Sequence, residues 1–400
     1  MKLTKFDVLL YIEGGIKSRE ALTSIIKENI KFENASERTI NACVRMLKKD
    51  KFIIEKNREL RINKSHRKTD DCLAFIHRTK TKDMDYNLLL NKNVVLVFKE
   101  ISDGGSDMKS LSERTALSKP SLLKIIDVLS KNNFICLEKK KPFHITANLN
   151  DITFFYINFC EFSLENFEKR FKIQKFQKIH SKGLTEKMIK LHTYSTTVTE
   201  GNTATENDVE KLFGNYPVNL TPREITEILN TRKAVELLYE IRNEEIEMIK
   251  IKDIHKILMF NLLNSAGEFC YKRKRIIGSE INPPESGEKI ESGINALLNF
   301  IKNYESEINP VILACILHFI FVTIHPFADG NGRMARLLHS WIYLRNNLPL
   351  FVFDPNRKFE YFETLEMGRK KNIDDFVAFC DKSMHEVLNE IAENSKKQTK

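Results

Sequence analysis

The sequence lacks the motifs of several large enzyme classes. Its 400 residues contain no Gly-x-x-x-x-Gly-Lys-Ser/Thr loop, no His-Glu-x-x-His pair and no Gly-x-Ser-x-Gly turn, which disfavours P-loop kinases and hydrolases. The longest apolar run, residues 311–324, is too short to cross a bilayer. The chain begins with a charged amphipathic segment instead of a secretory leader. These absences predict a soluble, cytoplasmic protein.

Cysteine is scarce and irregularly placed. The seven cysteines show neither zinc-type spacing nor a paired framework: Cys43, Cys72, Cys136, Cys160, Cys270, Cys315 and Cys380. We expect reduced and mostly buried thiols, as in a cytoplasm. His318 interrupts the apolar run, and we expect it to be a hydrogen-bonded core residue instead of a ligand.

Composition and charge indicate more than one domain. The chain is 42% hydrophobic and 30% charged, which is typical of a globular protein of two or three domains. Residues 1–150 hold 30 basic and 19 acidic residues, a net charge of +11, whereas residues 151–400 hold 34 and 35, a net charge of −1. A basic half joined to a neutral half hints at nucleic acid.

The basic half carries a repeated pattern of helix, helix and hairpin. In the first copy, helical spacing covers residues 18–29 and resumes at Ser36, and residues 52–62 alternate around a polar turn. In the second copy, helices open near Leu111 and Ser118, and residues 134–145 form the hairpin. Both copies resemble winged helix-turn-helix domains, which we assign to residues 1–68 and 91–148. Residues 64–85 are polar and charged, and we predict a linker over residues 69–90 with a short helix around residues 72–77.

A winged helix of this kind places its second helix in the major groove of DNA. The exposed candidates for contact with DNA are Arg38, Asn41, Arg45, Lys119, Ser121 and Lys124. Winged helices also dock proteins, and the sequence leaves open DNA, a protein partner and a homodimer. After this half, we predict one connecting helix over residues 151–183 and a helical domain over residues 184–394. The expected fold is mainly α.

The most informative segment is the run from His325 to Arg336. Gly330 and Gly332 flank Asn331, so the backbone can turn and direct successive N–H groups at an anion. A helix follows at once, and its N-terminus favours phosphate. Arg333 and Arg336 are three residues apart and share a face of that helix. The glycine turn, the helix N-terminus and the two arginines together predict a binding site for a nucleotide polyphosphate.

The pattern His-x-Phe-x-Asp-Gly-Asn-Gly-Arg-x-x-Arg resembles the motif of Fic-domain proteins at every defining position. The resemblance implies a helical bundle that moves AMP from ATP to a Ser, Thr or Tyr hydroxyl of a target protein. It implies that His325 is the general base, that Asp329 holds Mg²⁺ and that Phe327 anchors the loop. The implied phosphate-binding residues are Gly330, Asn331, Gly332, Arg333 and Arg336.

An upstream segment, residues 196–202, resembles the inhibitory motif of the same family. A carboxylate at Glu200 that pairs with Arg336 would occupy the guanidinium group that the γ-phosphate of ATP needs. Some relatives use this glutamate to position a water that removes AMP, so its role in the reverse reaction stays open. Gly201 suits the left-handed cap of a helix end.

Residues 267–280 predict a hairpin, which the resemblance identifies as the flap that docks the target segment through Ile276, Ile277 and Gly278. The basic run of residues 272–275 favours an acidic target or protects an edge strand, and both remain open. Tyr361 is either an adenine-side aromatic or a core residue.

Two hypotheses follow. The first is a protein adenylyltransferase with ATP as substrate and Mg²⁺ as cofactor, inhibited by Glu200. The alternative is a DNA-binding transcriptional regulator whose Fic-like domain senses nucleotide. Some relatives transfer UMP, phosphocholine or phosphate, so the sequence alone does not fix the nucleotide, the direction of the reaction or the target.

Overall fold

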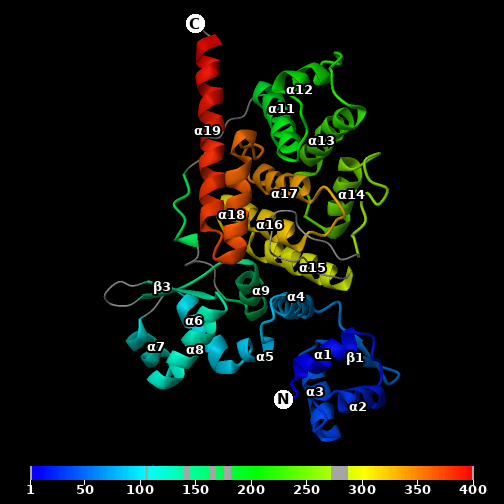
Figure 1. Cartoon of the computed structure of the whole chain (residues 1–400), viewed down its shortest axis with the longest axis vertical. Helices are drawn as coiled ribbons and strands as arrows, with labels where there is room; N and C mark the ends of the chain where they lie inside the picture. The colour runs from blue at the N-terminus through cyan, green and yellow to red at the C-terminus, as the bar shows by residue number, and fades with distance from the viewer. Residues whose placement is uncertain are drawn as a thin grey trace.

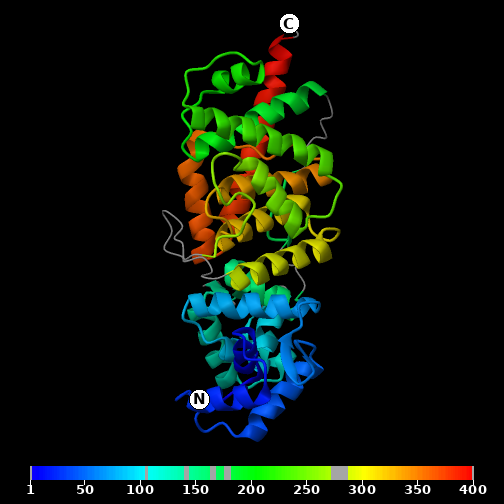
Figure 2. The same cartoon turned by 90° about the vertical axis from the view of Figure 1, so that its right-hand side faces the viewer.

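The computed structural model describes residues 2–103, 107–138, 144–162, 168–174, 182–271 and 287–398. Figures 1 and 2 show an elongated molecule, with the N-terminal half at one end and a helical bundle at the other. In the described ranges the only strands form two small antiparallel hairpins. The prediction of a mainly α fold is confirmed.

The first N-terminal unit has the predicted helix, helix and hairpin, preceded by one more helix. Ser18 and Ser36 cap the two predicted helices, since each hydroxyl accepts a backbone N–H from the first turn. In the hairpin, Asn57 and Arg58 form a two-residue turn with φ of 52° and 63°, the geometry that matches strand twist. The elements are α1 (Lys5–Glu13), α2 (Arg19–Glu28), α3 (Glu37–Lys49), β1 (Ile53–Lys56) and β2 (Glu59–Ile62).

The second unit repeats this order. Its middle helix begins before Leu111, because the Asp107 carboxylate accepts the N–H groups of Lys109 and Ser110 and so caps the helix earlier. Ile135 pairs with Ala147 at one end of the hairpin, and Glu138 pairs with His144 at the other. The elements are α6 (Lys92–Ser102), α7 (Met108–Thr115), α8 (Lys119–Lys131), β3 (Ile135–Glu138) and β4 (His144–Ala147).

The short helix predicted around residues 72–77 is present, but the segment of the predicted linker, residues 69–90, is more helical than expected. It contains α4 (Arg67–Thr81) and α5 (Tyr86–Leu89), and residues 71–79 are all buried. Figure 1 shows α4 between the N-terminal half and α15 (Gly287–Tyr304) of the bundle. The polar side chains of α4 are buried in paired contacts, such as His77 Nε2 at 2.7 Å from Glu13 Oε1. Polar composition therefore does not distinguish an exposed linker from this buried polar interface.

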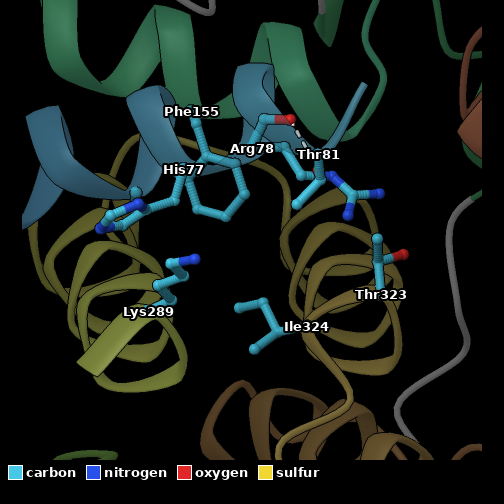
Figure 3. Close-up of a pocket in the computed structure, with 9 residues that line it drawn as sticks. His77, Arg78, Thr81, Phe155, Lys289, Thr323 and Ile324 are labelled. Carbon is cyan, nitrogen blue, oxygen red and sulfur yellow. Dashed lines mark hydrogen bonds between the residues drawn. The ribbon is translucent and has the colours of Figure 1, made fainter. Parts of the chain in front are cut away.

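A cavity of about 20 Å³ marks the junction between α4 and the bundle. Figure 3 shows Phe155 and Ile324 on opposite sides of this space, with His77 and Lys289 beside them. The volume suffices for about one water molecule. Since Ile324 directly precedes His325, the N-terminal half packs against the base of the segment that carries this histidine.

The predicted single helix over residues 151–183 is wrong. Helix α9 (Asp151–Cys160) ends after ten residues, where Glu161 adopts φ 55°. The N–H of Phe162 then returns to the Ile157 carbonyl at 3.1 Å, and the buried Phe162 ring secures this end of the helix. Residues 171–174 lie outside any helix.

The buried ion pair between α4 and α9 gives a test of this junction. Asp151 is fully buried and pairs with Arg78 and with Lys82. Burial alone would raise the pKa of the Asp151 carboxyl, but the two cations hold it below its ordinary value. The carboxyl therefore contributes stability that is present above pH ~4 and lost as the pH falls through the lowered pKa.

We expect Arg78→Met to lower the free energy of unfolding by about 3 kcal/mol at pH 7, because a buried carboxylate loses a partner. Lys68→Met is the matched control, since its pair with Glu161 is exposed on both sides and is worth less than about 1 kcal/mol. Urea unfolding at pH 7 and at pH 3 measures both variants. The gap between Arg78→Met and wild type should shrink at pH 3, and equal losses in the two variants would contradict the buried pair.

The C-terminal domain is a helical bundle around the predicted apolar run, residues 311–324, which are all buried and belong to α16 (Pro310–Ile324). His318 is a core residue as expected, with Nε2 at 2.8 Å from the Tyr361 hydroxyl. No helix in the described part of the chain is long and apolar enough to span a membrane. The elements are α11 (Lys182–Thr199), α12 (Glu206–Phe213), α13 (Pro222–Ile241), α14 (Met248–Leu258), α15, α16 (Pro310–Ile324), α17 (Asn331–Arg345), η1 (Pro355–Arg357), α18 (Lys358–Lys370) and α19 (Asp374–Gln398).

Candidate active site

His325 lies at the C-terminal end of α16, where it adopts a left-handed conformation with φ 54°. This conformation is rare for a residue with a side chain. Its Nδ1 lies 3.3 Å from the Val322 carbonyl oxygen. A carbonyl only accepts, so Nδ1 carries the proton in this contact and Nε2 is the basic nitrogen.

The loop after His325 is held by one amide and one ring. Asn331 Oδ1 accepts the Phe327 N–H at 2.9 Å, and Asn331 Nδ2 donates to the Phe327 carbonyl at 2.9 Å. The fully buried Phe327 ring stacks on His255, with centroids 3.6 Å apart and planes 3° apart. Phe327 is thus an anchor of the loop in the structure, as expected.

Gly330 begins α17 with φ 77°, so the turn has the positive φ that was predicted. A Cβ on Gly330 would lie 2.8 Å from the sulfur of Met259. The Asp329 side chain is about half exposed, and its Oδ1 accepts the Gly330 N–H at 2.6 Å. A half-exposed carboxylate therefore lies beside the helix N-terminus, a placement that would suit Mg²⁺ with phosphate oxygens.

Arg333 is buried, with 4% of its side chain exposed, yet its ion pairs are long. Its nearest carboxylates are Glu227 at 3.9 Å and Asp329 at 3.8 Å. Its Nε has no hydrogen-bond partner among the described residues. A buried guanidinium that is so weakly paired beside a helix N-terminus is the arrangement expected where an anion binds.

Arg336 is buried and its guanidinium is held from several sides. Nε donates to the Thr196 hydroxyl at 2.5 Å, and Nη1 donates to the Tyr361 hydroxyl at 3.3 Å. Nη2 forms an ion pair with Glu200 Oε1 at 2.5 Å, where the Glu200 side chain is one-third exposed. The structure thus brings together Glu200 and Arg336, which are 136 residues apart in the sequence.

The Glu200 carboxylate also covers the start of α17. A Cβ added to Gly332 would lie only 2.2 Å from Glu200 Oε1. The end of α11 fixes this placement, because Gly201 has φ 103° and its N–H donates to the Val198 carbonyl at 3.0 Å. The Asn202 N–H donates to the Thr197 carbonyl at 3.2 Å, which completes a Schellman cap.

The flap residues Ile276, Ile277 and Gly278 lie outside the described residues. The chain just before them is attached to the loop, because the Cys270 N–H donates to the Pro326 carbonyl at 2.8 Å. Tyr361 is fully buried between Arg336 and His318, so the structure places it in the core. Burial raises the pKa of its hydroxyl to about 12.

Of the proposed DNA contacts, four side chains are exposed and two are engaged. Asn41 Oδ1 accepts from Arg19 at 2.9 Å, and the Ser121 hydroxyl lies 3.0 Å from that of Ser118. The exposed residues are Arg38, Arg45, Lys119 and Lys124.

Sequence reasoning missed His255 and Met259, both on or next to α14. His255 Nε2 lies 3.0 Å from the Asp329 carbonyl oxygen, and its Nδ1 accepts the Gly267 N–H at 2.8 Å. Helical spacing places His255 on the apolar face with Ile251 and Leu258, and a histidine in such a face was the available signal.

One further group has soft metal ligands. Ligand atoms of Cys315, His339 and Cys380 lie within 4.8 Å of one another, all in the buried core. The His339 ring is stacked on Phe351 at 4.0 Å, and burial raises the pKa of the Cys380 thiol well above its ordinary value. With three ligands in an apolar core that favours the neutral thiol, we assign the group to core packing.

Gly330→Ala is expected to lower the free energy of unfolding by about 2–4 kcal/mol, because strain at positive φ adds to overpacking against Met259. Gly15→Ala is the matched control, since Gly15 has φ 96° and open space around the added Cβ; we expect about 1 kcal/mol from backbone strain alone. Thermal unfolding compares the two. A loss at Gly330 no larger than at Gly15 would contradict the contact with Met259.

The fold and the site define a mainly helical protein with a glycine turn between two buried helices, α16 and α17. Residues 246–343 match the model of the Fic/DOC family. The chain therefore contains a Fic domain.

Curated relatives carry the name protein adenylyltransferase Fic. The one from Nematostella vectensis is 29% identical over 195 residues, which are 47% of this chain and 45% of that protein. Protein adenylyltransferase fic-1 of Caenorhabditis elegans is 26% identical over 198 residues, 48% of this chain and 39% of that protein. The chain thus spans less than half of the length of these relatives.

Among solved structures, a Fic family protein from Desulfovibrio desulfuricans is 26% identical, with 54% of this chain and 67% of that chain covered and a TM-score of 0.47. Fic-1 from C. elegans is 18% identical, with 82% and 83% covered and a TM-score of 0.49.

Proposed function

We propose that the protein is an adenylyltransferase that moves AMP from ATP to a Ser, Thr or Tyr hydroxyl of a target protein. The observation that carries the proposal is the weakly paired, buried Arg333 beside the glycine turn, with the basic nitrogen of His325 on the preceding helix end. Relatives with the same domain are named protein adenylyltransferases. Together these features provide a base, an anion site and a metal-ligand carboxylate.

The proposed reaction is an in-line displacement at the α-phosphorus of ATP. The target hydroxyl oxygen forms the new P–O bond, the bond to the β-phosphate oxygen breaks, and pyrophosphate leaves. His325 takes the hydroxyl proton on Nε2. The N–H groups of the Gly330–Gly332 turn and the guanidinium of Arg333 hold phosphate oxygens and the charge that builds on them. Asp329 would hold a Mg²⁺, which would supply further positive charge to the phosphates.

Glu200 is proposed to inhibit this reaction. Its carboxylate occupies the Arg336 fork and covers Gly332, where the outer phosphates of ATP would bind. A nucleotide that enters in this state has the wrong pose for in-line attack. We also propose a second role for the same carboxylate, which is to direct a water at the phosphorus of an AMP-modified target hydroxyl. That water would release AMP and restore the hydroxyl.

The position of the label in ATP tests the proposed chemistry. We expect the Glu200→Gly protein with Mg²⁺ to transfer label from α-labelled ATP to itself or to lysate proteins, and to transfer none from γ-labelled ATP. Acid-stable label and a mass increase of one AMP group on a hydroxyl residue complete the assignment. Transfer of γ-label would sink the adenylyltransferase proposal in favour of a kinase.

For the N-terminal half we propose binding to DNA through two winged-helix domains. The +11 net charge of residues 1–150 and the exposed Arg38, Arg45, Lys119 and Lys124 support this. Affinity should fall steeply with salt, and charge reversal of Arg38 and Lys124 should weaken it. Salt-independent binding, or none at low salt, would favour a protein-docking role or a homodimer contact.

A further inference from the structure

We propose that His255 is a positioning residue that fixes Asp329 for Mg²⁺, an inference that rests on the proposed function. His255 lies on α14, fully buried and far in sequence from the catalytic loop. Its imidazole touches that loop at two points, through the stack on the Phe327 ring at 3.6 Å and through Nε2 at 3.0 Å from the Asp329 carbonyl oxygen. Side chains that orient a metal ligand act in this manner.

The two polar contacts of His255 define one tautomer. The Gly267 N–H donates to Nδ1 at 2.8 Å, so Nδ1 is unprotonated in this contact. The Asp329 carbonyl oxygen only accepts, so Nε2 carries the hydrogen. The neutral imidazole with its proton on Nε2 satisfies both partners at once, and no other protonation state does.

The same ring therefore joins two segments of the site, one at Asp329 and one at Gly267. The carbonyl of Asp329 is fixed from one side by His255, while the carboxylate of Asp329 is fixed from the other by the Gly330 N–H at 2.6 Å. Gly267 begins the stretch in which the Cys270 N–H donates to the Pro326 carbonyl. His255 thus sets the direction of the Asp329 side chain relative to the chain that leads to the flap. A small displacement of the Asp329 carboxylate would therefore weaken its hold on Mg²⁺ and slow the transfer.

Packing alone is the competing explanation, because the His255 ring also fills space beside Phe327. His255→Phe separates the two roles, since it keeps a ring for the stack and removes both hydrogen bonds. His255→Gln is the rescue variant, because its amide nitrogen can still donate to the Asp329 carbonyl without a ring. His339→Phe is the matched control: His339 is fully buried and stacked on Phe351 at 4.0 Å, and its ring contacts are with His318, Tyr343 and Phe351.

The experiment measures ATP binding by calorimetry, with and without Mg²⁺, in the inactive Glu200→Gly/His325→Ala protein. We expect His255→Phe to bind ATP normally without Mg²⁺. The increase in ATP affinity on adding Mg²⁺ should be about tenfold smaller than in the parent. His255→Gln should restore most of that gain, and His339→Phe should keep all of it. In the active Glu200→Gly protein, His255→Phe should raise the Mg²⁺ concentration for half-maximal transfer about tenfold, with kcat recovered at saturation.

The outcomes separate this inference from the proposed function. A His255→Phe protein that loses thermal stability but keeps the full Mg²⁺ gain overturns the positioning role and leaves the packing explanation. If His255→Phe does not fold, His255→Gln decides the question. Its amide keeps the donor but lacks the ring, so loss of the Mg²⁺ gain in this variant also overturns the positioning role. If the Glu200→Gly parent binds Mg²⁺ and ATP but transfers no AMP, the proposed function fails while the binding result still decides the role of His255. A parent that does not bind ATP overturns both.

Discussion

The Glu200→Gly protein is expected to transfer AMP about 100-fold faster than the wild type, because the competing partner of a buried guanidinium, worth about 3 kcal/mol, is removed. In the structure, Arg336 Nη2 is paired with Glu200 Oε1 at 2.5 Å. The same carboxylate excludes even a methyl group from the space above Gly332. Its removal opens both the fork of Arg336 and the start of α17.

The measurement is the initial rate of labelling with α-labelled ATP and Mg²⁺, at matched protein concentration. Glu210→Gly is the matched control, since Glu210 on α12 forms a 2.9 Å pair with Lys190 on α11 but is exposed; its rate should stay at the wild-type level. Glu200→Gln keeps the size of the side chain and loses its charge, so an intermediate rate is expected. If Glu200→Gly transferred AMP no faster than Glu210→Gly, Glu200 would not be an inhibitory residue.

His325→Ala in the Glu200→Gly background is expected to lower the rate of transfer by about 10³-fold, within the range for loss of a general base. The expectation rests on the contact of Nδ1 with the Val322 carbonyl, which leaves Nε2 as the basic nitrogen. Binding of ATP should be retained, because the turn and the two arginines are unchanged. The loss should thus lie in kcat.

Calorimetry and labelling rates on the same preparations make the comparison. His385→Ala is the control, since His385 lies on α19, with its Nε2 at 3.7 Å from Asp381. If the double variant still transfers AMP at the rate of Glu200→Gly, His325 is not the base. If it no longer binds ATP, the loss has a structural cause.

Local patterns predicted the elements of the N-terminal half well. Ser18 and Ser36 were expected helix starts and are caps in the structure, because a hydroxyl just before an apolar helical repeat satisfies free N–H groups of the first turn. The hairpins were likewise predicted from alternation around a turn. In contrast, α4 is longer than the short helix predicted around residues 72–77, and the predicted single helix over residues 151–183 is interrupted by the cap at Glu161.

The sequence by itself determined the parts of the candidate site that are contiguous in the chain. The run from His325 to Arg336 predicts a base, a carboxylate, a turn and two arginines, since their spacing alone places them at one helix start. Only the tertiary structure decided which distant residues meet them. Glu200 reaches Arg336 because the cap at Gly201 ends α11 there, and His255 reaches Asp329 because α14 packs beside the loop. Such contacts depend on how helices pack, which no local spacing records.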